Sequence, residues 1–113
     1  MIQILHNNRC RKSRDGVALL EASGKDFEII NYLEKVPTKA ELISILKLLE
    51  MKPIELVRKN EAIWKEQFKG KELSDDAIVQ AMVDYPKLIE RPIVINGNKA
   101  VIGRPVEKIS EII

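Results

Sequence analysis

The sequence predicts an α/β fold built on a mixed β-sheet, and three observations lead to this prediction. Short apolar runs lie at 2–5 and 27–32 near the start and at 93–95 and 100–102 near the end. A helical pattern joins the first two runs, which is typical of a βαβ unit with parallel strands. The Asn96-Gly97 step joins the last two, and this dipeptide is typical of a tight hairpin turn.

The first half of the chain has clear helix boundaries. The pattern is helical from Arg11 to Ser23, with Leu20 on the apolar side and Gly24 as a C-terminal stop. The apolar run after it, Phe27 to Tyr32, is the second predicted strand.

The middle of the chain is helical. Thr38 and Glu41 form a capping box that opens a helix, and Ser74 caps another that runs to about Val83. Between them we expect short helices from Pro53 through Arg58 and from Glu61 to Phe68. One further turn is expected at 87–89.

After the final hairpin, Pro105 fits the first position of a closing helix that reaches Ile113. The complete order is therefore βαβ, a block of helices, and ββα. This is the order of a thioredoxin-like mixed sheet with a helical insertion, at about 38–90, between its halves. With 113 residues and no linker, the chain is expected to form one domain, 1–113.

Composition excludes several function classes. A net charge of +2, with acidic and basic residues interspersed, does not favour nucleic acid as a partner. No apolar run approaches the ~20 residues of a membrane span, and no signal pattern opens the chain. We therefore expect a cytoplasmic protein with no membrane contact. One cysteine and one histidine give no ligand cluster, so no metal is expected.

Cys10 is the candidate reactive residue. A lone cysteine is most often a small buried hydrophobic residue. Cys10, however, follows the polar residues Asn7 to Arg9 and lies where a strand gives way to a helix. The free N–H groups at a helix start and nearby cations stabilise a thiolate. Cys10 is therefore predicted to be nucleophilic.

Two further residues accompany this sulfur. Ser13, three residues later, cannot act as a resolving thiol, but its hydroxyl is suited to donate to the thiolate or to a bound anion. The alternative is a helix-start hydroxyl with no chemical part. His6, four residues before Cys10, is either structural or a group that orients the thiol or moves a proton.

The stretch His6-Asn7-x-x-Cys10-x-x-Ser13-Arg14 resembles the active-site loop of the ArsC family of glutaredoxin-dependent arsenate reductases. The resemblance continues through the rest of the chain. It includes Asn31-Tyr32-Leu33, Pro37-Thr38, Leu56-Val57-Arg58-Lys59-Asn60, Glu90-Arg91-Pro92-Ile93-Val94 and Gly103-Arg104-Pro105. The sequence departs from the best-known members at Asn8, where they usually have proline, and at Arg11-Lys12, where they have small residues.

The resemblance implies a complete site. Cys10 attacks arsenate or a similar oxyanion to form a covalent adduct, which glutathione, as co-substrate, and glutaredoxin resolve with release of arsenite. Three arginines bind the oxyanion, and they correspond to Arg58, Arg91 and Arg104. Pro92 corresponds to the cis-proline beside the sulfur. No bound cofactor is implied, and we expect a monomer.

The predicted hairpin agrees with this set. Arg91 and Arg104 flank its two outer ends, so antiparallel pairing brings them to the same edge of the sheet. Guanidinium groups are permanently charged forks suited to the oxygens of a tetrahedral anion.

Two other functions remain open. Spx-like regulators use a related fold as a non-enzymatic interaction module, and the basic stretch 9–14 could contact an acidic partner. The Cys10-x-x-Ser13 spacing also suits a monothiol redox protein that acts on glutathione mixed disulfides. The interaction module predicts no thiol reactivity at Cys10. The monothiol redox protein predicts a reactive Cys10 that arsenate or phosphate does not specifically protect.

Overall fold

The computed structural model describes every residue from Met1 to Ile113. The chain divides into two compact units. The sheet unit comprises Met1–Lys35 and Arg91–Ile113, and the helical unit comprises Val36–Glu90. The second unit nearly coincides with the insertion predicted at 38–90.

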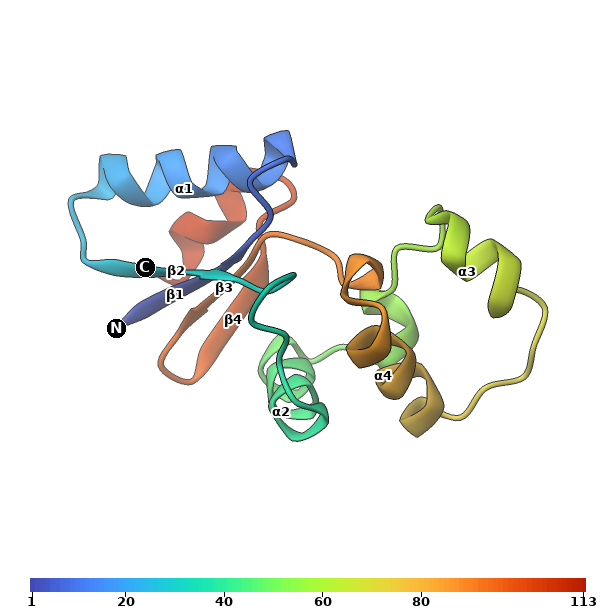
Figure 1. Ribbon diagram of the computed structural model, residues 1–113. Coiled ribbons are helices and arrows are strands. Elements are labelled where there is room, and N and C mark those ends of the chain that lie inside the picture. Colours follow the sequence, from blue (N-terminus) through green and yellow to red (C-terminus); the bar gives the residue numbers. More distant parts are fainter. The chain divides into compact units, whose positions relative to one another are not determined.

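The sheet unit has the predicted βαβ and ββα order (Figure 1). Its four-stranded sheet has the order β2-β1-β3-β4. Strands β1 and β2 are parallel, whereas β3 is antiparallel to both β1 and β4. The elements are β1 (Ile2–His6), α1 (Arg11–Ser23), β2 (Phe27–Asn31), β3 (Ile93–Asn96), β4 (Lys99–Ile102) and the 3-10 helix η3 (Val106–Glu111).

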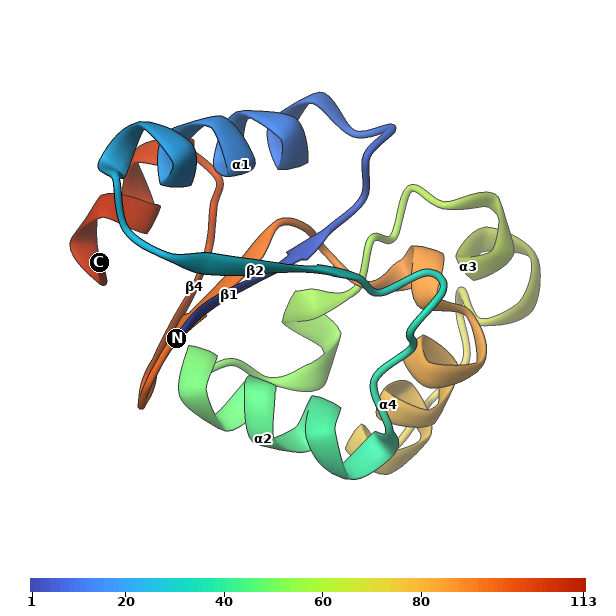
Figure 2. The same ribbon diagram turned by 60° about the vertical axis from the view of Figure 1, so that its left-hand side comes forward.

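Helices α1 and η3 lie together against the sheet (Figures 1 and 2). The core between them consists of buried aliphatic side chains from both strands and helices: Ile2, Ile4, Leu20, Val94 and Ile109. Because side chains alternate along a strand, Ile2 and Ile4 point to the same face of β1. The strand thus anchors the segment that leads into the Cys10 loop.

The hairpin turn sets the register that positions Arg91 and Arg104. Gly97 has a positive φ of 62°, which the tight turn requires and which glycine adopts without strain. Ile93 pairs with Ile102, and the N–H of Gly103 donates to the carbonyl of Pro92 over 2.9 Å. The Arg91–Pro92 and Arg104–Pro105 peptide bonds are both cis.

Gly16 allows the close packing of α1 on this core. A Cβ at Gly16 would lie 3.1 Å from both Ile4 Cδ1 and Pro92 Cγ. We therefore expect Gly16→Val to lower the free energy of unfolding by about 1–3 kcal/mol, as overpacking does. Ala18→Val, at an exposed position of the same helix, is the matched control, and urea unfolding compares them. Equal losses in the two variants would contradict this account of the packing.

The helical unit contains three α-helices and two 3-10 helices. Thr38 caps α2 through the predicted capping box, and Ser74 caps α4 by accepting from the N–H of Ala77 over 3.1 Å. Helix α4 contacts α2, η1 and η2. The elements are α2 (Lys39–Leu49), η1 (Pro53–Leu56), α3 (Ala62–Gln67), α4 (Asp75–Asp84) and η2 (Pro86–Leu88).

The structure differs from expectation at two short elements. Val57 and Arg58 follow η1 instead of belonging to it, because Val57 forms an antiparallel bridge with Ile89. The closing segment is a 3-10 helix that begins at Val106, with Pro105 before it. A tight helix of this length is enough to bring Ile109 into the core. All helices of the chain are too short or too polar to span a bilayer.

Candidate functional site

The loop after β1 fixes the position of Cys10. Asn7 accepts from the backbone N–H of Cys10 at its carbonyl and from the N–H of Arg9 at its Oδ1, each over 3.0 Å. These two bonds close a tight turn between strand and helix. Cys10 then occupies the N-cap of α1, with extended backbone, and its carbonyl accepts the first helical hydrogen bond from Arg14. The sulfur therefore lies at the positive end of the helix.

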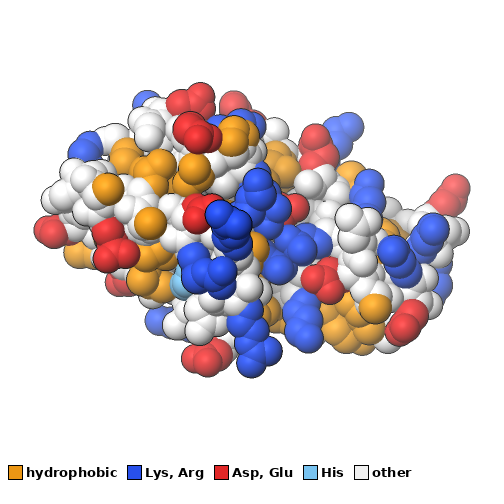
Figure 3. Space-filling model, turned by 90° about the horizontal axis from the view of Figure 1, so that it is seen from above, with side chains coloured by type: hydrophobic (Ala, Val, Ile, Leu, Met, Phe, Trp, Pro, Cys, Tyr) orange, Lys and Arg blue, Asp and Glu red, His pale blue; other side chains and the backbone are white.

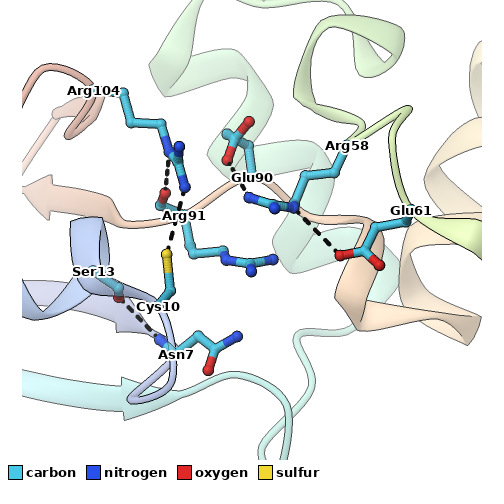
Figure 4. A network of polar contacts seen from close by, with 8 residues as sticks. All are labelled: Asn7, Cys10, Ser13, Arg58, Glu61, Glu90, Arg91 and Arg104. Atoms are coloured by element: carbon cyan, nitrogen blue, oxygen red, sulfur yellow. Dashed lines mark hydrogen bonds and ion pairs between the residues drawn. The ribbon is translucent and has the colours of Figure 1, made fainter.

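Two arginines that flank the hairpin act on this sulfur, and Figure 4 shows the contact that Arg104 makes with it. The Arg104 Nη2 lies 3.5 Å from Cys10 Sγ and donates to it. Arg104 Nε donates to the backbone carbonyl of Arg91 over 2.8 Å, which fixes the direction of the guanidinium. The side chain of Arg91 also favours the ionised form of the sulfur and so lowers the pKa of Cys10. The predicted meeting of Arg91 and Arg104 at one edge of the sheet is confirmed, and Cys10 is their meeting point.

These contacts lower the pKa of Cys10. Burial alone raises the pKa, since it disfavours the charged form. The backbone N–H of Ser13, the donated hydrogen bond of Arg91 and the charges of Arg91 and Arg104 together outweigh that effect. The net result favours a thiolate.

Ser13 has its hydroxyl engaged away from the sulfur. The side chain is fully buried; its Oγ lies 2.7 Å from His6 Nδ1 and accepts from the N–H of Asn7 over 3.0 Å. The part of Ser13 that acts on Cys10 is therefore its backbone amide. The direct role predicted for its hydroxyl toward the thiolate or an anion stays a prediction.

His6 supports the loop from the end of β1. Its ring is buried, with 8% of its surface exposed, and burial is the main reason that its pKa is lowered. The contact with Ser13 raises the pKa and the charge of Arg14 lowers it further. In the neutral ring, Nδ1 can accept a hydrogen bond from the Ser13 hydroxyl, while the Ser13 oxygen accepts one from the N–H of Asn7. His6 thus ties strand, loop and helix together.

The lowered pKa of His6 predicts a pH dependence of stability. In the unfolded chain His6 takes up a proton near its ordinary pKa of 6.5, whereas in the folded chain it does so only at a lower pH. Stability is therefore full above this value and declines as the pH falls below it. We expect the free energy of unfolding to drop between pH 7.5 and pH 5.5, and His6→Asn, which cannot titrate, to lose much of that drop. Urea titrations at the two pH values measure this drop. If His6→Asn showed the same drop as wild type, His6 would not be its source.

Arg58 belongs to the helical unit and lies between two carboxylates (Figure 4). Its Nη1 lies 3.0 Å from Glu90 Oε1, and its Nε lies 3.6 Å from Glu61 Oε1. Around the antiparallel Val57–Ile89 bridge, the Arg58 N–H donates to the Leu88 carbonyl, so Arg58 and Glu90 lie diagonally across the bridge, within reach of their long side chains. Binding of an anion by Arg58 stays a prediction, and both carboxylates would compete with that anion.

Comparison with known proteins agrees with this arrangement. The sequence model of the ArsC family matches residues 5–112. The chain belongs to the ArsC family.

Its relatives match along the whole length. The chain is 46% identical to the Uncharacterized protein YfgD of Escherichia coli (strain K12) and 38% identical to an arsenate reductase of Neisseria meningitidis. Both matches cover 99% of this chain, with 96% and 97% of the respective relatives. The solved structure of an arsenate reductase from Vibrio cholerae superposes with a TM-score of 0.94 at 42% identity, covering 99% of this chain and 97% of that one. The predicted thioredoxin-like α/β fold is confirmed.

For an ArsC-family chain, the resemblance implied Pro92 as the cis-proline, and the Arg91–Pro92 bond is cis. The structure adds one residue to which no role was assigned from the sequence. Asn7 holds the turn through both its backbone and its side chain. The preference of asparagine for turns that its own side chain closes was the available signal. No group of three or more His, Cys, Asp or Glu side chains is arranged to hold a metal ion.

Proposed function

We propose that this ArsC-family protein reduces arsenate to arsenite by a thiol-dependent reaction through a covalent Cys10–arsenate adduct. Glutathione and glutaredoxin resolve the adduct. Relatives named as arsenate reductases, at 38–42% identity over nearly the full length, support the substrate. The alternative class, a non-enzymatic interaction module, does not require an activated thiol.

One observation carries the proposal: the Cys10 sulfur lies 3.5 Å from the Arg104 guanidinium, and the positive charge of Arg91 also favours its ionised form. Near neutral pH arsenate is a tetrahedral anion, so its approach to a thiolate brings like charges together. Fixed guanidinium groups offset that repulsion. Their hydrogen bonds to the arsenate oxygens strengthen as charge develops there in the transition state. The same two groups that ionise the nucleophile are thus suited to hold its target.

The electron balance requires a second thiol. In the first step Cys10 Sγ bonds to arsenic and one arsenate oxygen leaves as water, without a change of oxidation state. Conversion of As(V) to As(III) takes up two electrons, which two thiols supply by forming one disulfide. Cys10 is the only cysteine of the sequence, so another molecule must provide the second thiol. We propose glutathione, with glutaredoxin regenerating Cys10, in a monomer that works in the reducing cytoplasm.

The test is a reconstituted assay. The protein is mixed with arsenate, NADPH, glutathione, glutathione reductase and glutaredoxin, and NADPH oxidation is followed. We expect oxidation that requires arsenate, glutathione and glutaredoxin. Rates equal to those of a mixture without the protein would overturn the proposal. If a small glutathione mixed disulfide is reduced instead, and arsenate does not slow that reduction, the monothiol redox function replaces it.

A further inference from the structure

Four cationic residues flank Cys10 in the sequence, and none of them makes the hydrogen bond to its sulfur, which comes from Arg104. Arg9 precedes Cys10, while Arg11, Lys12 and Arg14 occupy the first turn of α1. All four residues are exposed. We call Arg9, Arg11, Lys12 and Arg14 the cationic collar. Figure 3 shows Lys and Arg side chains gathered beside the histidine on the face seen from above.

The collar has no carboxylate partner within the chain. The ion pairs Lys39–Asp76, Arg58–Glu61 and Arg58–Glu90 do not involve a collar residue. Arg14 donates to the backbone carbonyl of Asn8 over 3.1 Å, which leaves its charge uncompensated. Even with the exposed carboxylate of Asp15 next to Arg14, the four cations leave a net positive charge around this end of α1.

The collar is spread too widely to serve a single small anion. Successive helical residues point about 100° apart, so Arg11 and Arg14 share one side of α1 while Lys12 points to another. Arg9 lies before the helix, on the far side of Cys10 in the sequence. An arsenate held against the sulfur between Arg91 and Arg104 can meet only some of these groups. A broad acidic surface can meet more of them at once than a single arsenate can.

We propose that the cationic collar docks the acidic surface of a protein whose own cysteine attacks oxidised Cys10. This inference rests on the proposed function, because that function leaves Cys10 in a disulfide which a second protein thiol must reduce. The incoming thiolate attacks the disulfide, a new sulfur–sulfur bond forms, and the old one breaks with release of the former partner as a thiolate. A second thiol, of the docked protein or of glutathione, then attacks the docked protein's sulfur, closes a disulfide with it and releases Cys10 as a thiolate.

The test uses the whole chain with Cys10 converted by 4,4′-dithiodipyridine to a mixed disulfide with a neutral leaving group. Three cysteine peptides of equal length carry glutamate, glutamine or lysine on both sides of the cysteine, and glutathione is a fourth thiol. The release of 4-thiopyridone gives each rate. Arg11→Glu/Lys12→Glu reverses half of the collar, and acidic residues in the first helical turn do not weaken the helix. Lys99→Glu/Lys108→Glu is the matched control at exposed positions of the same unit.

For the acidic peptide we expect the Arg11→Glu/Lys12→Glu rate to fall roughly tenfold or more, as electrostatic steering predicts, and the wild-type rate to fall with added salt. The rate with the glutamine peptide should change by less than about twofold in this variant, and the rate with the lysine peptide should rise. The control variant should match wild type. If the ratio of the variant rate to the wild-type rate were the same for all three peptides, the proposal would be overturned. A loss confined to glutathione would assign the collar to the small thiol instead and would also overturn it.

These outcomes are independent of arsenate, since no oxyanion is present in the peptide assay. Failure of arsenate turnover in the reconstituted assay together with retained charge selectivity here would remove the proposed substrate but keep the docking surface. The reverse result would keep the substrate and remove the docking surface.

Discussion

Cys10→Ser is expected to reduce arsenate-dependent NADPH oxidation to the level of a mixture without the protein. The proposed adduct forms on the sulfur, and a serine hydroxyl in the same position neither ionises near neutral pH nor forms a disulfide. The two arginines that lower the thiol pKa would then hold an anion beside a group unable to attack it. The measurement is the turnover rate in the reconstituted assay.

The substitution should leave the fold intact, which makes the loss interpretable. Cys10 occupies the N-cap of α1 without a side-chain cap hydrogen bond, and serine is among the preferred N-cap residues. The free energy of unfolding should therefore be unchanged or higher by about 0.5–1 kcal/mol. Turnover that persists in a folded Cys10→Ser protein would place the reaction elsewhere.

Arg104→Met is expected to lower arsenate turnover by roughly a hundredfold, the usual cost of removing one preorganised donor from an anion site. The substitution removes both the donor that lies 3.5 Å from Cys10 Sγ and the bond to the Arg91 carbonyl. Arg104→Lys should retain part of the activity, because it keeps the charge but not the two-donor geometry. The comparison is made on kcat/KM for arsenate.

Lys99→Met is the control for Arg104→Met, since it removes an exposed cation of the same hairpin. Its kcat/KM should remain within about twofold of wild type, as expected for an exposed charge far from the contacts of the sulfur. If both variants lost activity equally, general positive charge rather than the Arg104 contact would account for turnover.

The fold could be predicted largely from local patterns. The capping box at Thr38, the Asn-Gly turn at Gly97 and the apolar runs that became β1 to β4 all appear in the structure where the sequence places them. These signals are short in range, so a single sequence contains them. The type of the closing helix was not predictable in this way, because it depends on how Ile109 reaches a core formed by distant residues.

The site was predictable only in part. The approach of Arg104 to Arg91 follows from antiparallel pairing on either side of one turn, which the sequence reveals. The engagement of the Ser13 hydroxyl by His6 and Asn7 was not predictable, since spacing shows which groups are near but not which competes best for a hydrogen bond. The contact of Glu90 with Arg58 likewise depends on a bridge between segments 32 residues apart in sequence.

The central claim is that the sulfur of Cys10 is ionised beside the guanidinium groups of Arg91 and Arg104. The most direct measurement is the pH dependence of Cys10 alkylation by the neutral reagent iodoacetamide. The midpoint for the folded chain should lie below that of the same chain unfolded in urea, and arsenate should slow the reaction. A midpoint equal to or above that of the unfolded chain, with no protection by arsenate, would contradict the claim.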